Sequence, residues 1–463
     1  MGRKIAVVGA SPAGFTQLAY LANKRYEFYN EYKDDEYVLI HDPDKVLPVM
    51  LSGTNPAYWD ELAIATNMNR RWLSKYADGV DSHGYKFIGF GKRRDKNFMA
   101  SYRSQTGSHF DIEKFRTAML EDGGKAFGDN VSIIEEKIDS YQDNPSGGNI
   151  NGVQYDYVID CSETEPLKDE DAFGNPSISA VNTCLVLEKP EAGHWDYTIE
   201  YAAKYGHITG IPLKSKQLWI YFYNSLETEK DDILNDMQSA FPNDDISKWK
   251  QIGDVDGHSF RWTPRFSNYC VCPTTGRYIR NGAMLINVEP FLATTYECVH
   301  VMCDAISSLI HTLVPREVEH IKQQIQDSYF DLIAYDYQTY LAFMYHLGSR
   351  HDTDFWRQAK DEALNILNDK RLLHPGYFPG KKWIDGILCD KWDDEQYRRL
   401  IQSDNEIEDI GGRNKVMPLC IMNDYTTFAE IATGLGASYS DRFRVLDMCD
   451  PPEDYGTIGY EYC

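Results

Sequence analysis

The stretch Lys4-Ile5-Ala6-Val7-Val8-Gly9-Ala10-Ser11-Pro12-Ala13-Gly14 decides the fold of this 463-residue chain. Its first five residues predict a short buried strand, and the next six form a tight turn. Phe15 to Lys24 follow with apolar side chains at helical spacing. A second apolar strand, Glu36 to Ile40, ends on His41-Asp42-Pro43. This order of strand, glycine turn, helix and strand is typical of a dinucleotide-binding β-α-β unit.

The turn between the first strand and the helix has three positions that favour small residues. They allow a sharp turn, a close approach of the backbone to a pyrophosphate, and tight packing of helix on strand. Gly9 and Gly14 fill the first and third positions, whereas Ser11 replaces the second glycine and Ala13 precedes the last. The alternative is an ordinary strand-to-helix turn. After the second strand, Asp42 is the candidate acceptor for ribose hydroxyls, or else part of a solvated Asp-Pro turn.

The composition excludes several classes of function. With 71 acidic against 47 basic residues, the formal net charge of −24 would repel phosphate backbones and argues against nucleic-acid binding. No run approaches 18 apolar residues and no signal peptide is evident, so we expect a cytoplasmic protein without a membrane span. Ten cysteines without a C-x-x-C pair predict reduced core thiols rather than a disulfide framework. The scattered histidines predict no metal site.

The rest of the pattern predicts an α/β chain with two parts. The segment Ser140–Tyr157, rich in Asn and Gly, is interpreted as a turn between strands. Further strands are expected at Val158–Asp160, Thr183–Leu187, Leu218–Tyr223 and Ala283–Val288. Helices are expected at Ile112–Glu121, Glu227–Ala240, Thr295–Leu313, Arg316–Met344 and Thr353–Lys370. We expect a nucleotide-binding core over residues 1–295 with a β-rich middle at 180–290, and a helical cap on the substrate side over 296–463.

An ordered set of motifs resembles the flavin-dependent halogenases of the tryptophan-halogenase type. The motifs are Ser52-Gly53-Thr54-Asn55-Pro56, His83 to Phe90, His109-Phe110-Asp111, Tyr157 to Ser162, Gly206 to Pro212, Glu289 to Thr295, Ser349 to Trp356 and Gly434-Leu435-Gly436. The resemblance spans about residue 4 to about residue 440. It implies an FAD-binding Rossmann-like domain of the glutathione-reductase type, a β-rich substrate region and a helical C-terminal cap.

The resemblance also implies a reaction. Reduced FAD from a separate flavin reductase, together with O2, would oxidise a halide to hypohalous acid, which a lysine relays to a small electron-rich aromatic substrate. Lys86 matches that lysine, and strand alternation would place it on one face with Ile88 and Phe90. On the pattern alone, Lys86 is an edge-strand lysine with its ammonium in water.

The other site residues implied by the resemblance fall into three groups. Flavin contacts are expected from Gly9, Ser11, Ala13, Gly14, His41, Asp42, Ser52, Gly53 and Pro290. Halide is expected at the backbone N–H groups of Thr294 and Thr295. A tunnel wall is expected from Ile211 and Pro212. A strand-to-helix turn capped by one of the two threonines would coexist with the halide role.

The departures from the family pattern leave alternatives open. His207 and Thr209 replace two tryptophans, which either weakens a barrier against monooxygenase-type substrates or opens the tunnel. Ser52 and Leu292 replace glutamates, and the loss at 292 argues against free tryptophan as substrate. Bromide or iodide would be accepted as well as chloride, and a homo-oligomer is compatible with the sequence. An FAD-dependent aromatic monooxygenase, or a non-catalytic binder of flavin or an aromatic ligand, would explain the same fold.

Overall fold

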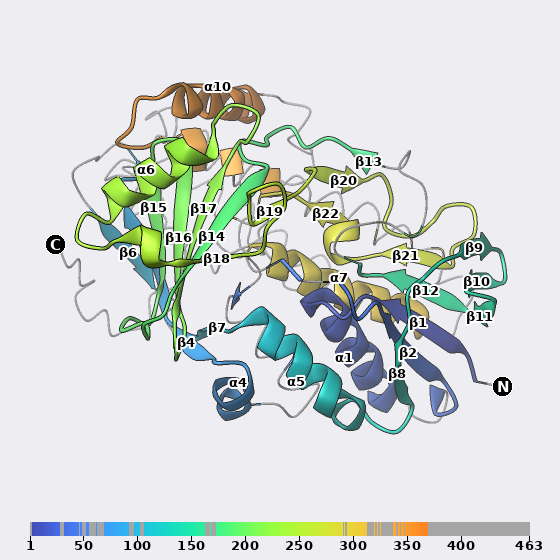
Figure 1. Cartoon of the computed structure of the whole chain (residues 1–463). Helices are drawn as coiled ribbons and strands as arrows, with labels where there is room; N and C mark the ends of the chain where they lie inside the picture. The colour runs from blue at the N-terminus through green and yellow to red at the C-terminus, as the bar shows by residue number, and fades with distance from the viewer. Residues whose placement is uncertain are drawn as a thin grey trace, which may run out of the picture.

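A computed structural model shows two sheets with the main hydrophobic core between them (Figure 1). It describes residues 2–27, 32–45, 47–48, 52–54, 62, 69–91, 97–101, 106–162, 167, 173–289, 291, 294–312, 319, 322, 325, 337–338, 341–342, 344–346 and 348–368. One sheet is parallel and contains the first strand of the chain. The other is larger and contains the β-rich middle.

The parallel sheet is built around the strands predicted for a nucleotide-binding unit. Its five strands lie in the order β21-β12-β1-β2-β8, and every neighbouring pair is parallel. They are β1 (Lys4–Val8), β2 (Glu36–His41), β8 (Val131–Glu135), β12 (Tyr157–Asp160) and β21 (Tyr278–Arg280). Residues 5–8 of β1 are buried, as a central strand covered on both faces requires. The predicted Rossmann-like α/β fold is confirmed.

Helices cover one face of this sheet. The predicted helices are present as α1 (Pro12–Glu27), α5 (Ile112–Ala126) and α7 (Thr294–Ile310). α1 and α7 lie side by side (Figure 1), joined by a 3.0 Å hydrogen bond from Gln17 Nε2 to Ser307 Oγ. Phe15 of α1 meets Phe115 of α5 edge-to-face, with ring centroids 6.0 Å apart. The helical face of the parallel sheet is therefore continuous with the main core.

The other face corrects one prediction. The segment Ser140–Tyr157 is not a turn but an antiparallel meander of β9 (Tyr141–Asn144), β10 (Gly147–Ile150) and β11 (Val153–Tyr155). The Asn and Gly residues do form turns, and Gly152 has a φ of +86°. The strands between them are held because Ile150 and Tyr155 are buried against β1 and β2. Short strands between strong turn signals are easily mistaken for loop.

The larger sheet confirms the predicted β-rich middle. Its order is β18-β14-β17-β16-β15-β5-β6, with β19 (Phe260–Arg261) paired to β14. The other strands are β5 (Gly84–Ile88), β6 (Phe98–Ser101), β14 (Thr183–Lys189), β15 (Thr198–Ala203), β16 (Gly206–Pro212), β17 (Gln217–Tyr223) and β18 (Lys250–Ile252). One face packs on the main core. The opposite face carries a second cluster, covered by the predicted helix α6 (Lys230–Ala240) (Figure 1).

The predicted strand Ala283–Val288 is largely wrong. The segment forms a 3-10 turn, η4 (Gly282–Met284), followed by the two-residue strand β22 (Ile286–Asn287). The cause is local, because Gly282 has a φ of +59° and its N–H donates to the Asn281 side chain at 2.8 Å. Farther on, the predicted helix at 353–370 is present as α10 (Asp354–Asn368). The predicted helix at 316–344 lies mostly outside the described residues, as does most of the cap.

Shorter elements complete the described part. A small sheet has the order β3-β7-β4, and another has the order β13-β20-β22. These strands are β3 (Gly53–Thr54), β4 (Val80–Ser82), β7 (Gly107–His109), β13 (Phe173–Gly174) and β20 (Arg265–Ser267). The remaining helical turns are α4 (Arg70–Tyr76) and η3 (Ile246–Lys248). The boundary between core and cap stays a prediction.

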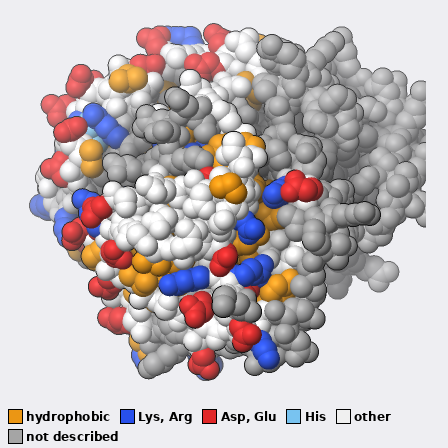
Figure 2. Space-filling view, turned by 90° about the vertical axis from the view of Figure 1, so that its right-hand side faces the viewer, with side chains coloured by type: hydrophobic (Ala, Val, Ile, Leu, Met, Phe, Trp, Pro, Cys, Tyr) orange, Lys and Arg blue, Asp and Glu red, His pale blue; other side chains and the backbone are white. Residues whose placement is uncertain are grey.

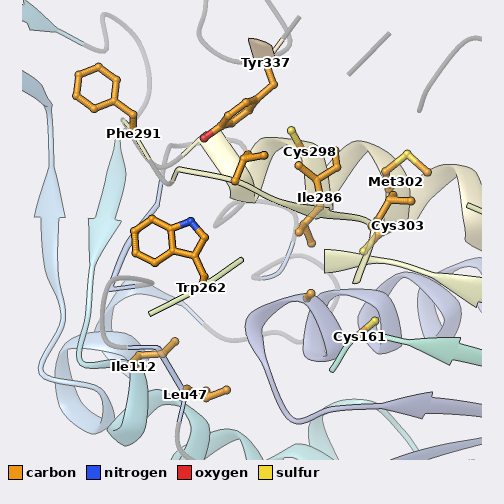
Figure 3. Packing of buried hydrophobic residues seen from close by; sticks show 14 of the residues in the cluster. Leu47, Ile112, Cys161, Trp262, Ile286, Phe291, Cys298, Met302, Cys303 and Tyr337 are labelled. Carbon is orange, nitrogen blue, oxygen red and sulfur yellow. The ribbon is translucent and has the colours of Figure 1, made fainter. Parts of the chain in front are cut away.

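The core contains the cysteines of the described part. Figure 3 shows Cys161, Cys298 and Cys303 among apolar side chains, with Cys298 next to Ile286. Cys184, Cys270 and Cys272 are buried as well. Burial raises the pKa of the Cys184 and Cys303 thiols. The interpretation as core thiols is confirmed for these six, and the other four lie outside the described residues.

Two features of the surface and helices bear on partners. Charged side chains of both signs are interspersed over the described part of the face in Figure 2, so this face shows no extended patch of one sign. Within the described ranges, no helix is both long enough and apolar enough to cross a membrane.

Candidate functional site

The turn after β1 has the geometry of a phosphate-binding loop. Gly9 has a φ of +109°, and a β-carbon added to it would lie 2.6 Å from the Cys161 carbonyl oxygen. A β-carbon at Gly14 would lie 1.9 Å from the Gly9 carbonyl oxygen. Both positions therefore require glycine, one for its conformation and one for helix–strand contact. The predicted roles of these two residues in the turn agree with the geometry.

Ser11 fits the turn without the second glycine. Its hydroxyl donates to the Cys161 carbonyl at 3.1 Å and accepts the Gly14 N–H at 3.2 Å, so it caps α1. The side chain is fully buried in these contacts. Pro12 then occupies the first helical position, where its missing N–H costs nothing. Ala13 is also buried and small, so the start of α1 stays accessible to backbone contacts.

A cleft of about 250 Å³ opens beside this turn. Its walls come from the turn after β1, the end of β2 and the segment that follows β8. The lining includes Gly9, Ala10, Ser11, Ile40, His41, Asp42, Lys45, Arg116 and Tyr141. A cleft at the carboxyl ends of parallel strands, next to a helix start, is the usual place for a dinucleotide in this fold.

His41 and Asp42 both line this cleft, but their side chains differ in their contacts. The Asp42 carboxylate accepts the Asp44 N–H at 3.0 Å, which closes an Asx turn. His41 is only 3% exposed, and neither ring nitrogen has a hydrogen-bond partner among the described residues. Burial and the neighbouring Arg116 charge lower the pKa of His41, so its imidazole is neutral at pH 7. The Arg116 side chain in turn donates to the Asp42 carbonyl at 3.1 Å.

Ser52 and Gly53, the predicted flavin contacts that we call the strap, lie next to Ile211 of the predicted tunnel wall. Ser52 is buried, and its carbonyl accepts the Phe110 N–H at 2.9 Å. A β-carbon at Gly53 would lie 3.2 Å from His109 Cδ2 and 3.8 Å from Ile211 Cδ1. His109 is buried, which lowers its pKa to about 3, and its Nε2 lies 2.8 Å from Thr198 Oγ1. The strap thus contacts β16 next to its end.

Pro212 and Ile211 are both buried at the end of β16, but in different surroundings. Ile211 belongs to the main core, on the face of the large sheet that looks toward the parallel sheet. Pro212 is in close contact with Gly193, where an added β-carbon would lie 2.2 Å from the proline Cβ. The geometry supports a wall position for Ile211. It gives Pro212 a packing contact.

Lys86 lies apart from this group. It is half-buried in β5 and pairs with Ile199 of β15, which packs on the cluster under α6. Its Nζ lies 5.8 Å from the centroid of the Tyr197 ring. The expectation that it shares a face with Ile88 is consistent with the strand, but Phe90 is on the other face. Gly89 has a φ of +74°, which turns Phe90 into the main core.

β5 is also not an edge strand, since it lies between β15 and β6. The alternative interpretation of Lys86 as an edge-strand lysine is therefore wrong. The structure does not bring Lys86 together with the turn, the strap and Ile211. These lie toward the other face of the large sheet.

The predicted halide segment is described in part. Thr294 and Thr295 are the first two residues of α7, so their N–H groups have no partner within the helix. Their side chains lie outside the described part, as do Pro290, Leu292 and Ala293. Glu289 and Phe291 are described and almost completely buried.

A buried cluster that the sequence did not predict lies next to this segment. His207 Nε2 is 3.0 Å from Glu289 Oε1, and His207 Nδ1 is 3.7 Å from Glu200 Oε2. Thr209 Oγ1 donates to Glu200 Oε2 at 2.9 Å, and the Tyr345 hydroxyl donates to Glu289. His207 has no exposed surface, so replacing tryptophan has not opened the sheet at this position.

The cluster holds a protonated histidine. Burial alone would lower the pKa of His207, but the two carboxylates raise it to about 9. Burial also raises the pKa of Glu200. The imidazole stacks on Phe222, with centroids 4.8 Å apart, and meets Phe291 edge-on at 4.7 Å. Both tryptophan replacements thus contribute polar side chains to the same buried carboxylate.

Comparison with protein-family models identifies the family of this chain. The family model described as tryptophan halogenase matches residues 92–372, more than half of the chain. The chain belongs to the tryptophan halogenase family. The members of this family are flavin-dependent enzymes. Membership therefore implies FAD as cofactor and an aromatic compound as substrate. The glycine turn, the cleft and the buried His41 ring, whose nitrogens have no hydrogen-bond partner among the described residues, fit such a nucleotide.

Solved structures of two halogenases and of a dihydroxylase share the fold at low sequence identity. A tryptophan halogenase from Shewanella frigidimarina has a TM-score of 0.68 and 14% identity, covering 97% of this chain and 93% of its own. A flavin-dependent halogenase from Xanthomonas campestris has 0.65 and 14%, covering 98% and 97%. A peptidyl tryptophan dihydroxylase has 0.55 and 14%, covering 78% and 79%. No curated protein sequence matches the chain.

Proposed function

We propose that this member of the tryptophan halogenase family halogenates a small electron-rich aromatic compound. When bound, reduced FAD supplies with O2 and one proton the two-electron oxidation of halide to hypohalous acid, leaving FAD and water. The hypohalous acid then replaces one aromatic hydrogen by halogen and releases water. A separate flavin reductase would supply the reduced FAD.

The observation that carries the proposal is the convergence of two implied segments on β16, one expected at the flavin and one at the halide. The flavin strap reaches it through Gly53 and Ile211, and the segment leading to α7 reaches it through Glu289 and His207. The phosphate turn starts the helix that packs on α7. A flavin, a halide and the wall between them would therefore share one strand.

The chain's own residues would perform binding and exclusion of water. The backbone N–H groups of Ala10, Ser11 and Ala13 would hold the pyrophosphate, and His41 would hydrogen-bond the nucleoside. Ser52 and Gly53 would cover the flavin, with Pro290 beside it. The first N–H groups of α7, at Thr294 and Thr295, would hold the halide. Buried Phe90 and Phe291, whose ring centroids are 5.9 Å apart, keep water from the inner face.

Lys86 is proposed as the residue that hands the oxidant to the substrate. The substrate would then lie on the side of Tyr197, across the sheet from His207. Lysine ammonium next to an aromatic ring is partly desolvated, which suits a reactive lysine. Because Leu292 replaces a glutamate, we propose phenols, anilines or substituted indoles rather than free tryptophan. Bromide and iodide are proposed as halides alongside chloride.

Mass spectrometry of products tests this function. The full-length protein is incubated with FAD, a flavin reductase, NADH, one halide and a panel of indoles, phenols and anilines, with catalase and a no-enzyme blank. We expect a halogen mass shift that Lys86→Ala abolishes. Lys204→Ala is the matched control, since Lys204 Nζ lies 5.7 Å from the Tyr205 ring in a similar arrangement. Equal loss in both variants would contradict the role of Lys86.

The second candidate is an FAD-dependent aromatic monooxygenase. It is favoured by the fold shared with the dihydroxylase and by the missing tryptophans. The same experiment distinguishes it, because the product would gain 16 mass units without halide and Lys86→Ala would leave turnover intact. Bound FAD without turnover on a widened panel would favour the non-catalytic binder.

A further inference from the structure

The buried cluster around His207 has no task in the reaction as proposed. It lies at the junction of two segments far apart in the sequence, β16 and residues 289–291. Ion pairs that are completely buried lose their hydration and are costly to maintain. Three ionisable side chains are each at most 1% exposed here: Glu200, His207 and Glu289. Such a cluster needs a compensating benefit.

The benefit of the cluster lies in the contacts that it makes with Glu289 and Phe291. Glu289 accepts from both His207 and Tyr345 through the same Oε1 atom. Phe291, two residues later, rests against the His207 ring, and it stacks on Tyr345 at 6.5 Å between centroids. The path from Glu289 to the first helical residue, Thr294, is five residues. The cluster therefore holds Glu289 and Phe291, which precede the start of α7 by a few residues.

We propose that His207 is a positioning residue for halide binding: by holding Glu289 and Phe291, it sets the place of the first N–H groups of α7 against β16. This rests on the proposed function, because it takes those N–H groups as the halide site. Thr209 and Glu200 act behind His207, since Thr209 donates a hydrogen bond to Glu200, whose Oε2 forms a 3.7 Å ion pair with His207 Nδ1.

The position of His207 argues for a protonated ring. Groups facing it are Glu200 from β15, Thr209 from β16 and Glu289 from the segment after β22, with Tyr345 behind Glu289. A neutral imidazole has one N–H and no charge, so it would lose the ion-pair attraction to both Glu200 and Glu289. Loss of the proton would therefore loosen the segment and weaken halide binding.

The test compares His207→Phe, His207→Gln and His258→Phe. Phenylalanine keeps the ring between Phe222 and Phe291 but removes both polar contacts. Glutamine retains one N–H donor for Glu289. The matched control His258 is buried and hydrogen-bonded to Tyr223 in the same sheet, away from residues 289–291.

The first measurement is hydrogen exchange of the full-length protein, which requires neither halide nor substrate. For His207→Phe we expect exchange over residues 286–300 to be about ten-fold faster, with residues 4–14 unchanged. His258→Phe should leave 286–300 as in the wild type. Equal exchange in wild type and His207→Phe, or the same increase in His258→Phe, would overturn the inference.

The second measurement is bromide binding to the FAD-loaded protein, followed by the flavin absorption spectrum. We expect the bromide Kd to rise about ten-fold in His207→Phe, with partial recovery in His207→Gln and an FAD Kd within about two-fold of wild type. Wild-type affinity should weaken above about pH 9, and that of His207→Phe should not. An unchanged bromide Kd in His207→Phe would overturn the inference.

The outcomes separate this inference from the proposed function. A wild type that binds bromide but modifies no aromatic compound, together with a weakened His207→Phe, refutes the function and supports the inference. If the wild type halogenates an aromatic compound and His207→Phe matches the wild type in both hydrogen exchange and bromide Kd, the proposed function is supported and the inference is refuted. Where the wild type binds no bromide, the exchange of residues 286–300 decides alone.

Discussion

Substitution of Gly14 by alanine tests the phosphate turn most directly. The added β-carbon would lie 1.9 Å from the Gly9 carbonyl oxygen, whereas ordinary contact begins near 3.4 Å. Both groups are backbone or attached directly to it, so the start of α1 must move by about 1.5 Å away from β1. Ser11 would lose its 3.2 Å contact to the Gly14 N–H at the same time.

The magnitude follows from these two losses. Overpacking in a tight backbone contact costs about 1–3 kcal/mol of folding free energy. Displacing N–H groups from a pyrophosphate removes charge-assisted hydrogen bonds worth about 2 kcal/mol, which is about 30-fold in Kd. We therefore expect Gly14→Ala to lower the Tm and to raise the FAD Kd about 30-fold.

The assay is titration of FAD by fluorescence at a temperature well below the Tm, with thermal unfolding measured separately. Gly174→Ala is the control, because its added β-carbon would have its nearest neighbour at 3.5 Å, an ordinary contact. Wild-type FAD affinity in a folded Gly14→Ala variant would refute the assignment of the turn to the pyrophosphate. So would an equal loss in the control.

Three further predictions follow from named contacts. Because the pKa of His207 is raised, the protonated ring stabilises the fold fully below about pH 6.5, and this stabilisation is lost as the pH rises through about 9. Urea unfolding should therefore show that the wild type loses stability over this pH range and that His207→Phe does not. His41→Ala should weaken FAD binding about five-fold, with a lower Tm because the ring is buried, and an unchanged Kd in calorimetry would remove His41 from the site. Trp356→Phe loses the 2.7 Å bond from its Nε1 to the Ala203 carbonyl and should cost about 1 kcal/mol in denaturant unfolding, so an unchanged midpoint would count against it.

The β1-α1-β2 unit of the parallel sheet could be predicted because its signals are local, whereas β8 and β21 were not predicted. Apolar strands and a glycine turn lie within about forty residues of one another. The meander at 141–155 was missed because its strands are short and half exposed, so the turn residues dominate the pattern. The face of Phe90 was missed because alternation assumes an unbroken strand, and Gly89 breaks it.

The cluster around His207 could not be found from the sequence for a different reason. Glu289 follows His207 by 82 residues in the sequence, and Tyr345 follows Glu289 by 56 residues. Nothing near any one of these residues indicates that they meet. A signal did exist, since a polar residue at an inward-facing strand position requires a partner. The histidine in place of tryptophan within Gly206 to Pro212 marked that position.

The strand β16 also sets the distance between the contacts made by His207 and by Ile211. His207 and Ile211 are four residues apart on the same face, and a strand rises about 3.3 Å per residue, so their contacts lie about 13 Å apart. The separation between the strap and residues 289–291 thus belongs to the backbone. Side-chain changes that reshape a substrate pocket leave it as it is. Deleting one residue within β16 would instead turn either His207 or Ile211 to the opposite face of the sheet. Substitutions can therefore change the chemistry at His207 and at Ile211, but they leave the distance between the two contacts unchanged.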